Sequence, residues 1–383
     1  METRKLFYED SDLRVFTAEV TSCAAVKGGY HITLSATAFY PEGGGQACDM
    51  GMLGAARVLD VQEVQGDICH LCDAPLTVGS MVEGRIDWER RLDLMQQHSG
   101  EHIVSGLICS RFGYHNVGFH VGSDMMEIDF DGPIPASALA EIEWQANEAV
   151  WKNMPIRCYY PSPEELPHVP YRSKKALEYP VRIVEIPGID SCACCGVHVK
   201  TTGQIGLVKV VSCVKFHQGV RIELACGNRA LRLLREIFEQ NKLVSQAFSA
   251  KMLETGAAAA KMNEALAAEK LRANTLQTKL LQQTADAYRG KGNTVHFEPQ
   301  LGGGQLRQLC DAIAAVCGGW AAVLSGSEGN YNLCILQPGG DIAPLVCALK
   351  EHFSVRGGGK PGTFQGTVSG LQEEILAFFQ SRV

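Results

Sequence analysis

The chain has 383 residues, which is too many for one compact core, so roughly two to four domains are expected. Its 46% hydrophobic and 20% charged residues are typical of an ordinary soluble globular protein, and no run of about 18 apolar residues indicates a membrane span. A net charge of −7 gives the chain as a whole no attraction for nucleic acid.

The N-terminus and the cysteines indicate a cellular compartment. The first ten residues lack the apolar core of a signal peptide. Fifteen cysteines, an odd number, in a long chain without an export signal are typical of reduced thiols. We therefore expect a cytoplasmic protein without disulfides and without membrane association.

The first segment, residues 1–88, is expected to form a small β-barrel. Its β-rich runs, such as 16–20 and 31–35, are interrupted by turns at 28–29 and 41–45. Short strands with frequent turns are typical of small barrels.

The second segment, residues 89–226, is expected to be an α+β domain. Helical patterns and strand-like runs alternate along it. The helices are predicted over 92–110 and 136–152, and the strands over 181–186 and 206–211.

Residues 227–290 are predicted to form a helical linker or hairpin. We expect Asn228 to cap the first helix and Gly256 to mark a turn between two antiparallel helices. Apolar residues that recur at steps of three and four predict a coiled-coil-like seam, and with it a homodimer. They are Met262, Leu266, Ala273, Leu276 and Leu280.

The last segment, residues 291–383, is predicted to be a small glycine-rich α/β domain. Strand-like runs at 320–324 and 332–336 alternate with helical patterns at 303–316, 341–352 and 370–381. The expected fold class is therefore multidomain α+β.

Two histidines four residues apart carry the strongest chemical signal. His98 and His102 share a helix face, so both imidazoles can reach one metal ion. Cys194 and His198 repeat the spacing downstream, and thiolate with imidazole suits Zn²⁺. An isolated HxxxH is more often two core histidines, but the matched second pair favours a zinc site.

Other cysteines lie close to similar patterns. Cys192 and Cys195 flank Cys194 and could compete with it for the metal or be oxidised. The run Cys69-His70-Leu71-Cys72 has no matching second half, so we interpret Cys69 and Cys72 as ordinary structural thiols.

Several motifs together resemble one family. FYPEGGGQ at 39–46, followed by the HxxxH and CxxxH pairs, is similar to the editing domain of alanyl-tRNA synthetases and to the freestanding AlaX proteins. TGQIGL at 202–207 and GVRIE at 219–223 resemble further runs of that domain, and RGGGKP at 356–361 resembles the synthetase's C-terminal domain. Because the aminoacylation domain is absent, the chain resembles the long AlaX subclass.

The resemblance implies hydrolysis of the ester that joins a wrong amino acid, serine or glycine, to tRNA(Ala). Zinc would orient the aminoacyl end or polarise a water, and four protein ligands leave both roles open. Gln46 would contact the substrate through its amide, and Thr37 matches a family threonine associated with choosing serine over alanine. Gln46 and Thr37 are the predicted catalytic residues.

The stretch between Pro170 and Arg229 is locally basic. It holds nine Lys or Arg against four acidic residues, which predicts a phosphate-binding face, with a solvated face that binds nothing as the alternative. With the glycine-rich loops and the family motifs, it suggests a set of tRNA contacts. They are Gly44, Gly45, Lys200, Arg221, Arg356 and Lys360.

Two other functions fit part of the pattern. His98 to His102 matches the H-x-x-E-H metallopeptidase motif with Glu101 as base, but that leaves Cys194 and His198 without a role. A zinc-stabilised tRNA-binding module without catalysis explains the basic stretch and the helices. Release of serine from Ser-tRNA(Ala), with Ala-tRNA(Ala) spared, distinguishes the editing hydrolase from both.

Overall fold

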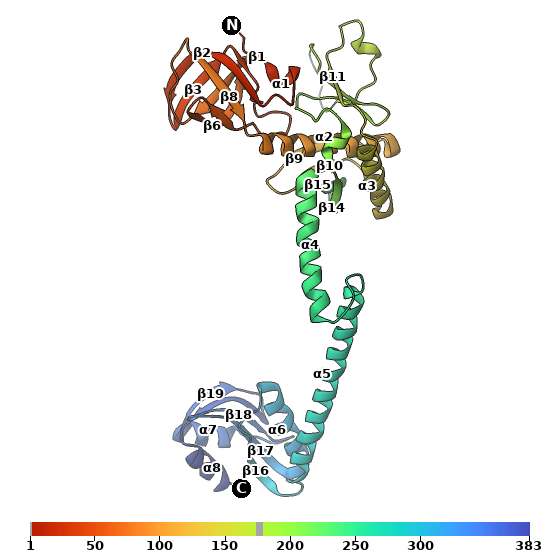
Figure 1. The fold of residues 1–383 in the computed structure, drawn as a ribbon. Helices are drawn as coiled ribbons and strands as arrows, with labels where there is room; N and C mark the ends of the chain where they lie inside the picture. Colours follow the sequence, from red (N-terminus) through yellow and green to blue (C-terminus); the bar gives the residue numbers. More distant parts are fainter. Residues whose placement is uncertain (1, 174–178) are drawn as a thin grey trace. The chain divides into compact units, whose positions relative to one another are not determined.

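The computed structural model describes residues 2–173 and 179–383, and the chain divides into two compact units, Met1–Leu243 and Val244–Val383 (Figure 1). Helices and strands alternate in both, so the mixed α+β, multidomain class is confirmed. None of the helices in the described residues is long and apolar enough to cross a membrane.

The first unit begins with a closed six-stranded barrel. A short strand β1 (Arg4–Lys5), paired in parallel with β4 (Ala36–Thr37), and the one-turn helix α1 (Leu6–Glu9) lie beside it. Side chains alternate between the barrel interior and solvent, as expected for strands with one buried face. The barrel order is β2 (Val15–Val26), β3 (Gly29–Leu34), β7 (Asp67–Cys72), β6 (Ala56–Val64), β5 (Gly51–Leu53) and β8 (Met81–Ile86).

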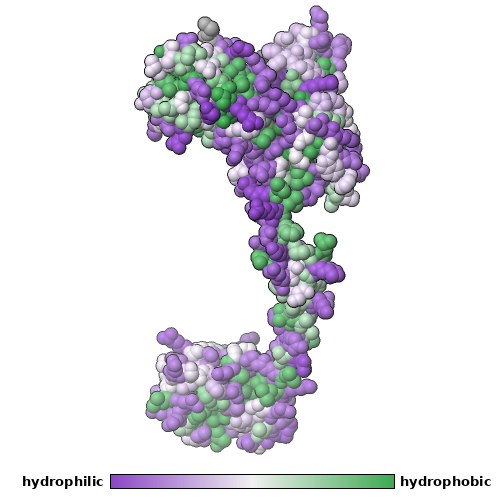
Figure 2. All heavy atoms as spheres, in the orientation of Figure 1, coloured by the Kyte–Doolittle hydropathy of each residue, from purple (hydrophilic) through white to green (hydrophobic). Residues whose placement is uncertain are grey.

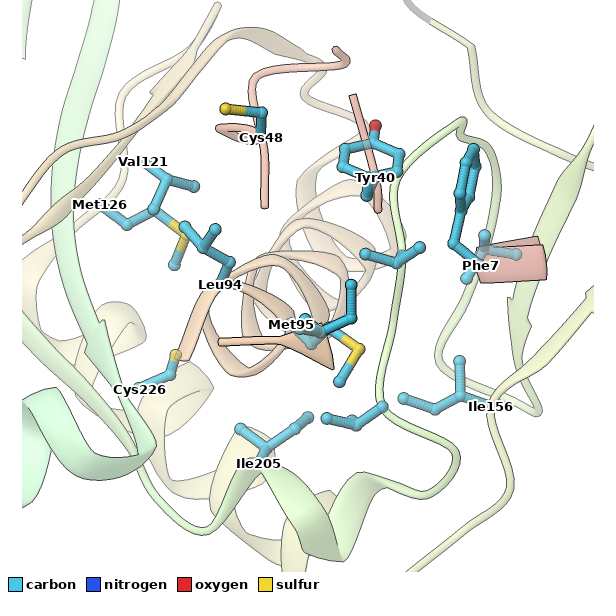
Figure 3. Close-up of a cluster of buried hydrophobic side chains, with 14 of the residues drawn as sticks. Phe7, Tyr40, Cys48, Leu94, Met95, Val121, Met126, Ile156, Ile205 and Cys226 are labelled. Carbon is cyan, nitrogen blue, oxygen red and sulfur yellow. The ribbon is translucent and has the colours of Figure 1, made fainter. Parts of the chain in front are cut away.

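The long helix α2 (Trp88–Phe112) follows the barrel directly. Asp87 caps its start by accepting from the backbone N–H of Arg90 at 3.2 Å, and Gly113 ends it in the left-handed conformation. Arg91, which is fully buried, forms an ion pair with buried Asp49 and so fastens the helix to the barrel segment. Figure 3 shows Leu94 and Met95 of α2 packed within the same buried core.

Two further sheets complete the first unit. A four-stranded sheet has the order β14-β15-β10-β9, and helix α3 (Ala136–Trp151) packs on β14 and on α2. A three-stranded sheet has the order β11-β12-β13, and η1 (Leu166–His168) and η2 (Thr202–Ile205) are single 3₁₀ turns. The strands are β9 (Asn116–Val121), β10 (Met126–Phe130), β11 (Arg157–Tyr159), β12 (Ile183–Ile186), β13 (Asp190–Ala193), β14 (Val208–Phe216) and β15 (Gly219–Cys226).

The helical segment corrects two predictions. Helix α4 (Gly227–Ala247) already includes Asn228, whose side chain therefore does not cap it. The break before α5 (Thr255–Asp286) falls at residues 248–254, so Gly256 lies in the first turn of α5 and not at the turn. The predicted seam residues of α5 are all solvent-exposed, and apolar side chains show on the surface of the helical segment (Figure 2). The coiled-coil pairing stays a prediction.

The second unit contains a five-stranded sheet between two layers of helix. Alternating residues of β17 (Gly318–Ser327) point to opposite faces, so Val323 packs with α6 (Gly303–Cys317) and Leu324 packs in the other cluster. That cluster includes residues of α7 (Ala343–His352) and α8 (Gln372–Gln380). The sheet order is β16 (Gly292–Phe297), β17, β18 (Asn330–Leu336), β20 (Thr363–Ser369) and β19 (Ser354–Gly358).

Candidate metal centre

The four predicted metal ligands meet in one buried cluster. His98 and His102 lie one turn apart on α2, and Cys194 and His198 come from the loop that follows β13. Their ligand atoms all lie within 4.8 Å of one another. Cys194 Sγ is 3.4 Å from His98 Nε2 and 3.5 Å from His198 Nε2, close to the roughly 3.5 Å that tetrahedral zinc imposes on neighbouring ligands.

Each histidine of the cluster makes a hydrogen bond through Nδ1, the ring nitrogen that points away from the cluster. A ring whose Nδ1–H donates to an oxygen keeps its Nε2 lone pair for a metal, which fixes the tautomer and the ring orientation. All three acceptors are buried side chains. The pairs are His98 with Gln46 Oε1 at 2.8 Å, His102 with Asp190 Oδ2 at 2.8 Å and His198 with Ser99 Oγ at 3.1 Å. The donor set and its support therefore fit Zn²⁺.

The Cys194 loop is fixed by contacts from distant segments. Arg182 donates to the carbonyls of Cys194 at 2.9 Å and Gly196 at 2.8 Å, and its guanidinium stacks on Tyr8. The Tyr8 hydroxyl donates to the Cys195 carbonyl at 2.7 Å. A Cβ added at Gly196 would lie 2.2 Å from the His98 ring, so only glycine fits there.

The environment of Cys194 favours its thiolate. Burial alone would raise the pKa of this thiol. While no metal is bound, protonated imidazoles can neighbour the sulfur instead, and the charge of His98 together with hydrogen bonds from the histidines lowers that pKa well below its usual range. Burial raises the pKa of Cys192, whose Sγ lies with His102 and Asp190 rather than in the four-atom group. Cys195 is exposed. Of the three neighbouring thiols, the geometry places Cys194 in the cluster.

A pocket of about 280 Å³ opens beside the cluster, and its lining includes Gly44, His98, Glu101, Phe119 and Cys194. Gly44 belongs to the turn at residues 43–46, whose ends exchange backbone hydrogen bonds at 3.0 and 3.1 Å. Gly44 and Gly45 have φ angles of 60° and 83°, and a Cβ at Gly45 would lie 2.5 Å from the Phe119 ring. Both glycines are therefore required by the backbone.

Comparisons with known proteins match two segments of the first unit. Residues 181–223, which include Cys194 and His198, match the threonyl and alanyl tRNA synthetase second additional domain. Residues 3–90, which include the barrel, match the class II (A) tRNA synthetases.

Whole-chain relatives agree with these matches. The alanyl-tRNA editing protein Aarsd1 of Mus musculus is 28% identical over 97% of this chain and 96% of its own length. The chain is homologous to the alanyl-tRNA editing proteins. An alanine–tRNA ligase of Thermofilum pendens is 32% identical over 96% of this chain but only 42% of its own length. The resemblance to the AlaX and synthetase editing family is thereby confirmed.

Thr37 lies in a buried position of this editing-protein homologue, where its hydroxyl is already engaged. Burial lowers the pKa of His70 to about 4, so His70 is neutral, and its Nδ1–H donates to the Ile32 carbonyl at 3.0 Å. Its Nε2 therefore accepts from the Thr37 hydroxyl at 2.9 Å, while Thr37 Oγ1 accepts from the Phe39 N–H at 3.1 Å. The described residues that line the pocket beside the cluster do not include Thr37.

His70 also bears on the second cysteine pattern, Cys69-His70-Leu71-Cys72. Its two nitrogens are used by Ile32 and Thr37, and neither His70 nor its cysteine neighbours occur in a metal-compatible group among the described residues. Burial raises the pKa of both Cys69 and Cys72. These observations support the interpretation of Cys69 and Cys72 as structural thiols.

Most of the described Lys and Arg residues between Pro170 and Arg229 pair with other groups of the protein. These cations bind distant carboxylates or carbonyls, so the local charge count overstates the basic face. Lys174 and Lys175 lie outside the described residues. The internal partners are Asp190 for Arg172, carbonyls for Arg182, Asp10 and Asp12 for Lys200, Glu143 for Lys209, Asp129 and Glu127 for Arg221, and Asp93 for Arg229.

The proposed tRNA contacts are thus of two kinds. Lys200 and Arg221 are paired with acids, whereas Arg356 on β19 and Lys360 in the following loop are solvent-exposed. Lys360 lines a pocket of about 300 Å³ with glycines 358, 359 and 362. None of these contacts is tested by the comparisons, and all six stay predictions.

The sequence alone missed the residues that support the cluster. Asp190, Ser99, Arg182 and Tyr8 belong to no short metal motif. Asp190, Ser99 and Tyr8 contact the cluster across 88, 99 and 187 residues of sequence. Of these four residues, Ser99 could have been found from the sequence, because it directly follows the predicted ligand His98.

Proposed function

We propose that this chain is a trans-editing hydrolase that removes serine, and glycine, from mischarged tRNA(Ala). The observation that supports it best is the convergence of His98, His102, Cys194 and His198 beside a pocket whose lining includes Gly44 of the turn at residues 43–46. The relatives' names, alanyl-tRNA editing protein and alanine–tRNA ligase, supply the substrate class.

The four ligands would hold Zn²⁺, which supplies either Lewis-acid polarisation of the ester carbonyl or a fixed positive charge that orients the aminoacyl end. His98, His102 and His198 keep their Nε2 atoms toward that position because their Nδ1 atoms donate to Gln46, Asp190 and Ser99. The predicted metal ligands and the residues behind them thus act as one rigid assembly.

Gln46 contributes a second polar group to the reaction. Its Oε1 accepts from His98, which turns the amide nitrogen away from the ring. That Nε2 is buried and has no hydrogen-bond partner among the described residues. In this proposal it donates to the ester carbonyl oxygen as negative charge develops there, a contribution whose loss typically costs about 10²–10³ in rate.

Thr37 takes a positioning role in this proposal. Its oxygen accepts a hydrogen bond from the Phe39 N–H at the start of the FYPEGGGQ segment, and its hydroxyl donates a hydrogen bond to His70 Nε2. Thr37 would therefore influence serine selection by holding the segment that carries Gln46. It would not do so by donating its own hydroxyl proton to the substrate.

The substrate's tRNA body would be bound by the remaining predicted contacts. Arg356 and Lys360 are exposed beside a glycine-rich loop of the second unit, where basic side chains can approach phosphates. The exposed apolar residues of α5 would serve homodimerisation.

A deacylation assay tests the proposal. Purified protein with bound zinc is incubated with Ser-, Gly- and Ala-tRNA(Ala), and release of the amino acid is followed. We expect rapid loss of serine and glycine and sparing of alanine, with all activity lost in Cys194→Ala. Serine release at the uncatalysed rate by zinc-loaded protein contradicts the proposal and favours a binding module.

A further inference from the structure

Two tryptophans lie exposed on one face of helix α3 and have no part in the function proposed above. Trp144 and Trp151 are 60% and 59% exposed. Tryptophan carries a large apolar surface, so an exposed pair of this kind is typical of a contact surface. The two indole rings meet edge to face, with centroids 5.5 Å apart and planes at 83°. Two nearly perpendicular rings form a corner that presents aromatic faces to a ligand.

The charge of α3 determines which kind of ligand suits this corner. Between Ala136 and Trp151 the helix carries three glutamates and no Lys or Arg. Glu148 shares the face of the two tryptophans, because it follows Trp144 by four residues and precedes Trp151 by three. Trp144 Nε1–H donates to Glu148 Oε1 at 3.2 Å. An acidic, aromatic face attracts cations and repels phosphates, so it suits a cationic ligand and not the backbone of a tRNA.

The three glutamates of α3 differ in how their charges are compensated. Glu141 and Glu143 bind cations of other elements at 2.6 and 2.8 Å. No Lys, Arg or His in the described part of the chain forms an ion pair with Glu148, and Lys152, the first basic residue after it, is exposed. The terminal carbonyls of α3, close to Trp151, add partial negative charge. The capacity of this face to bind a cation is therefore concentrated at Glu148 and the two rings.

A cavity beside the same helix extends the surface. It has a volume of about 390 Å³, and its lining includes Leu139 and Ala140 of α3 and Val211 of β14. Ala140 is exposed and precedes Trp144 by four residues, so the cavity and the tryptophan pair are neighbours along the helix. Ala140 and Glu148 are about 12 Å apart along the axis, the rise of eight helical residues. A ligand that fills both places needs an apolar group at that distance from its cation.

We propose that this surface, the α3 face, docks a segment of another protein that carries an arginine and an apolar side chain. The arginine would stack on Trp144 and Trp151 and bind Glu148, while the apolar side chain fills the cavity. Arginine fits better than lysine, because its planar guanidinium stacks on indole and forms two parallel bonds to a carboxylate. Tryptophan and arginine also dominate many protein–protein contacts. Neither tryptophan lines the pocket beside the metal centre, so the α3 face is separate from the proposed editing chemistry.

A pair of peptides tests the requirement for a cation. The probe is Gly-Leu-Ser-Ser-Ser-Arg-Gly with blocked ends, in which an extended backbone puts leucine and arginine about 13 Å apart. The second peptide carries citrulline, a neutral isostere, in place of arginine. Calorimetric titration into the full-length protein should show the arginine peptide binding about tenfold more tightly than the citrulline peptide. Equal affinities, or no binding of either peptide, overturn the proposal.

Two variants and a matched control assign the preference to individual residues. Trp151→Leu keeps an apolar side chain but removes an aromatic face, and Glu148→Gln removes only the charge, so each should remove the preference for arginine. Glu236→Gln removes an exposed carboxylate from α4 and should preserve it. None of the three side chains is buried, so thermal unfolding should match the wild type and show that the variants are folded. A preference that survives Trp151→Leu and Glu148→Gln, or that disappears in Glu236→Gln, rejects the site.

Two other occupants of the α3 face are distinguished by separate measurements. The affinity for tRNA(Ala) should be the same in the wild type and in Trp151→Leu. Weaker tRNA binding by the variant would assign the tryptophans to nucleic acid and overturn the proposal. Sedimentation should likewise give both proteins the same oligomeric state. A dimer that is lost in Trp151→Leu would show that a second copy covers the face, which would overturn the assignment to another protein.

Discussion

Two regions of the first unit bury a histidine beside cysteines, yet they do different things. On strand β7, His70 uses both ring nitrogens within the barrel, donating to Ile32 and accepting from Thr37. In the candidate metal centre, each of the three histidines uses only Nδ1 in a hydrogen bond to the supporting side chains and directs Nε2 toward Cys194. Burial and residue type are similar in the two places. What makes a site is the convergence of atoms whose hydrogen-bonding capacity the fold has left available.

The largest difference between the two regions is expected when one cysteine of each is replaced by alanine. Cys194→Ala deletes a ligand atom, so we expect zinc to be lost and deacylation of Ser-tRNA(Ala) to fall by roughly 10³-fold or more. Cys72→Ala removes a fully buried barrel thiol and should leave zinc content and kcat/KM unchanged, with stability lower by about 1 kcal/mol. Zinc analysis and the deacylation assay measure both. Retention of zinc by Cys194→Ala would show that Cys192 or Cys195 can replace it.

The same comparison shows what the sequence could predict. Short-range patterns located most helices, some of the strands and the two pairs of predicted ligands, because a four-residue spacing puts side chains on one face or in one loop. The hydrogen-bond partners of those residues could not be predicted from the sequence, because Asp190 lies 88 residues from His102 and Gln46 lies 52 residues from His98. Charge counting failed for the same reason, because Arg229 and Arg221 meet Asp93 and Asp129 only in the folded chain.

The barrel histidine should make stability depend on pH. Its pKa is about 4 in the folded protein and about 6.5 when unfolded, so the unfolded chain takes up the proton first as the pH falls. The stabilisation is complete above pH 6.5 and is lost between pH 6.5 and 4, by about 3 kcal/mol. Urea unfolding across that range measures it. His70→Gln should flatten this part of the profile; an unchanged slope would mean that His70 does not carry it.

Replacing the carboxylate behind His102 should weaken the metal centre without destroying it. Asp190→Asn keeps the shape but removes the charge that binds both His102 and Arg172. We expect zinc affinity to fall about 10- to 100-fold, because outer partners fix the ring and raise its basicity. Competition with a chelator gives the affinity. An affinity equal to that of the wild type would show that the ring is held by packing alone.

Among the variants of the residues that support the histidines, Ser99→Ala should reduce zinc affinity least. It tests whether the charge of the supporting side chain or only its hydrogen bond to the ring matters. The Ser99 hydroxyl accepts from His198 at 3.1 Å and from the Val199 N–H at 3.3 Å, without a formal charge. A neutral hydrogen bond contributes about 1 kcal/mol, so zinc affinity should fall by no more than about tenfold. The same chelator competition, run beside Asp190→Asn, compares them directly. Equal losses in the two variants would mean that ring orientation, and not the carboxylate's charge, governs how tightly the centre holds its metal.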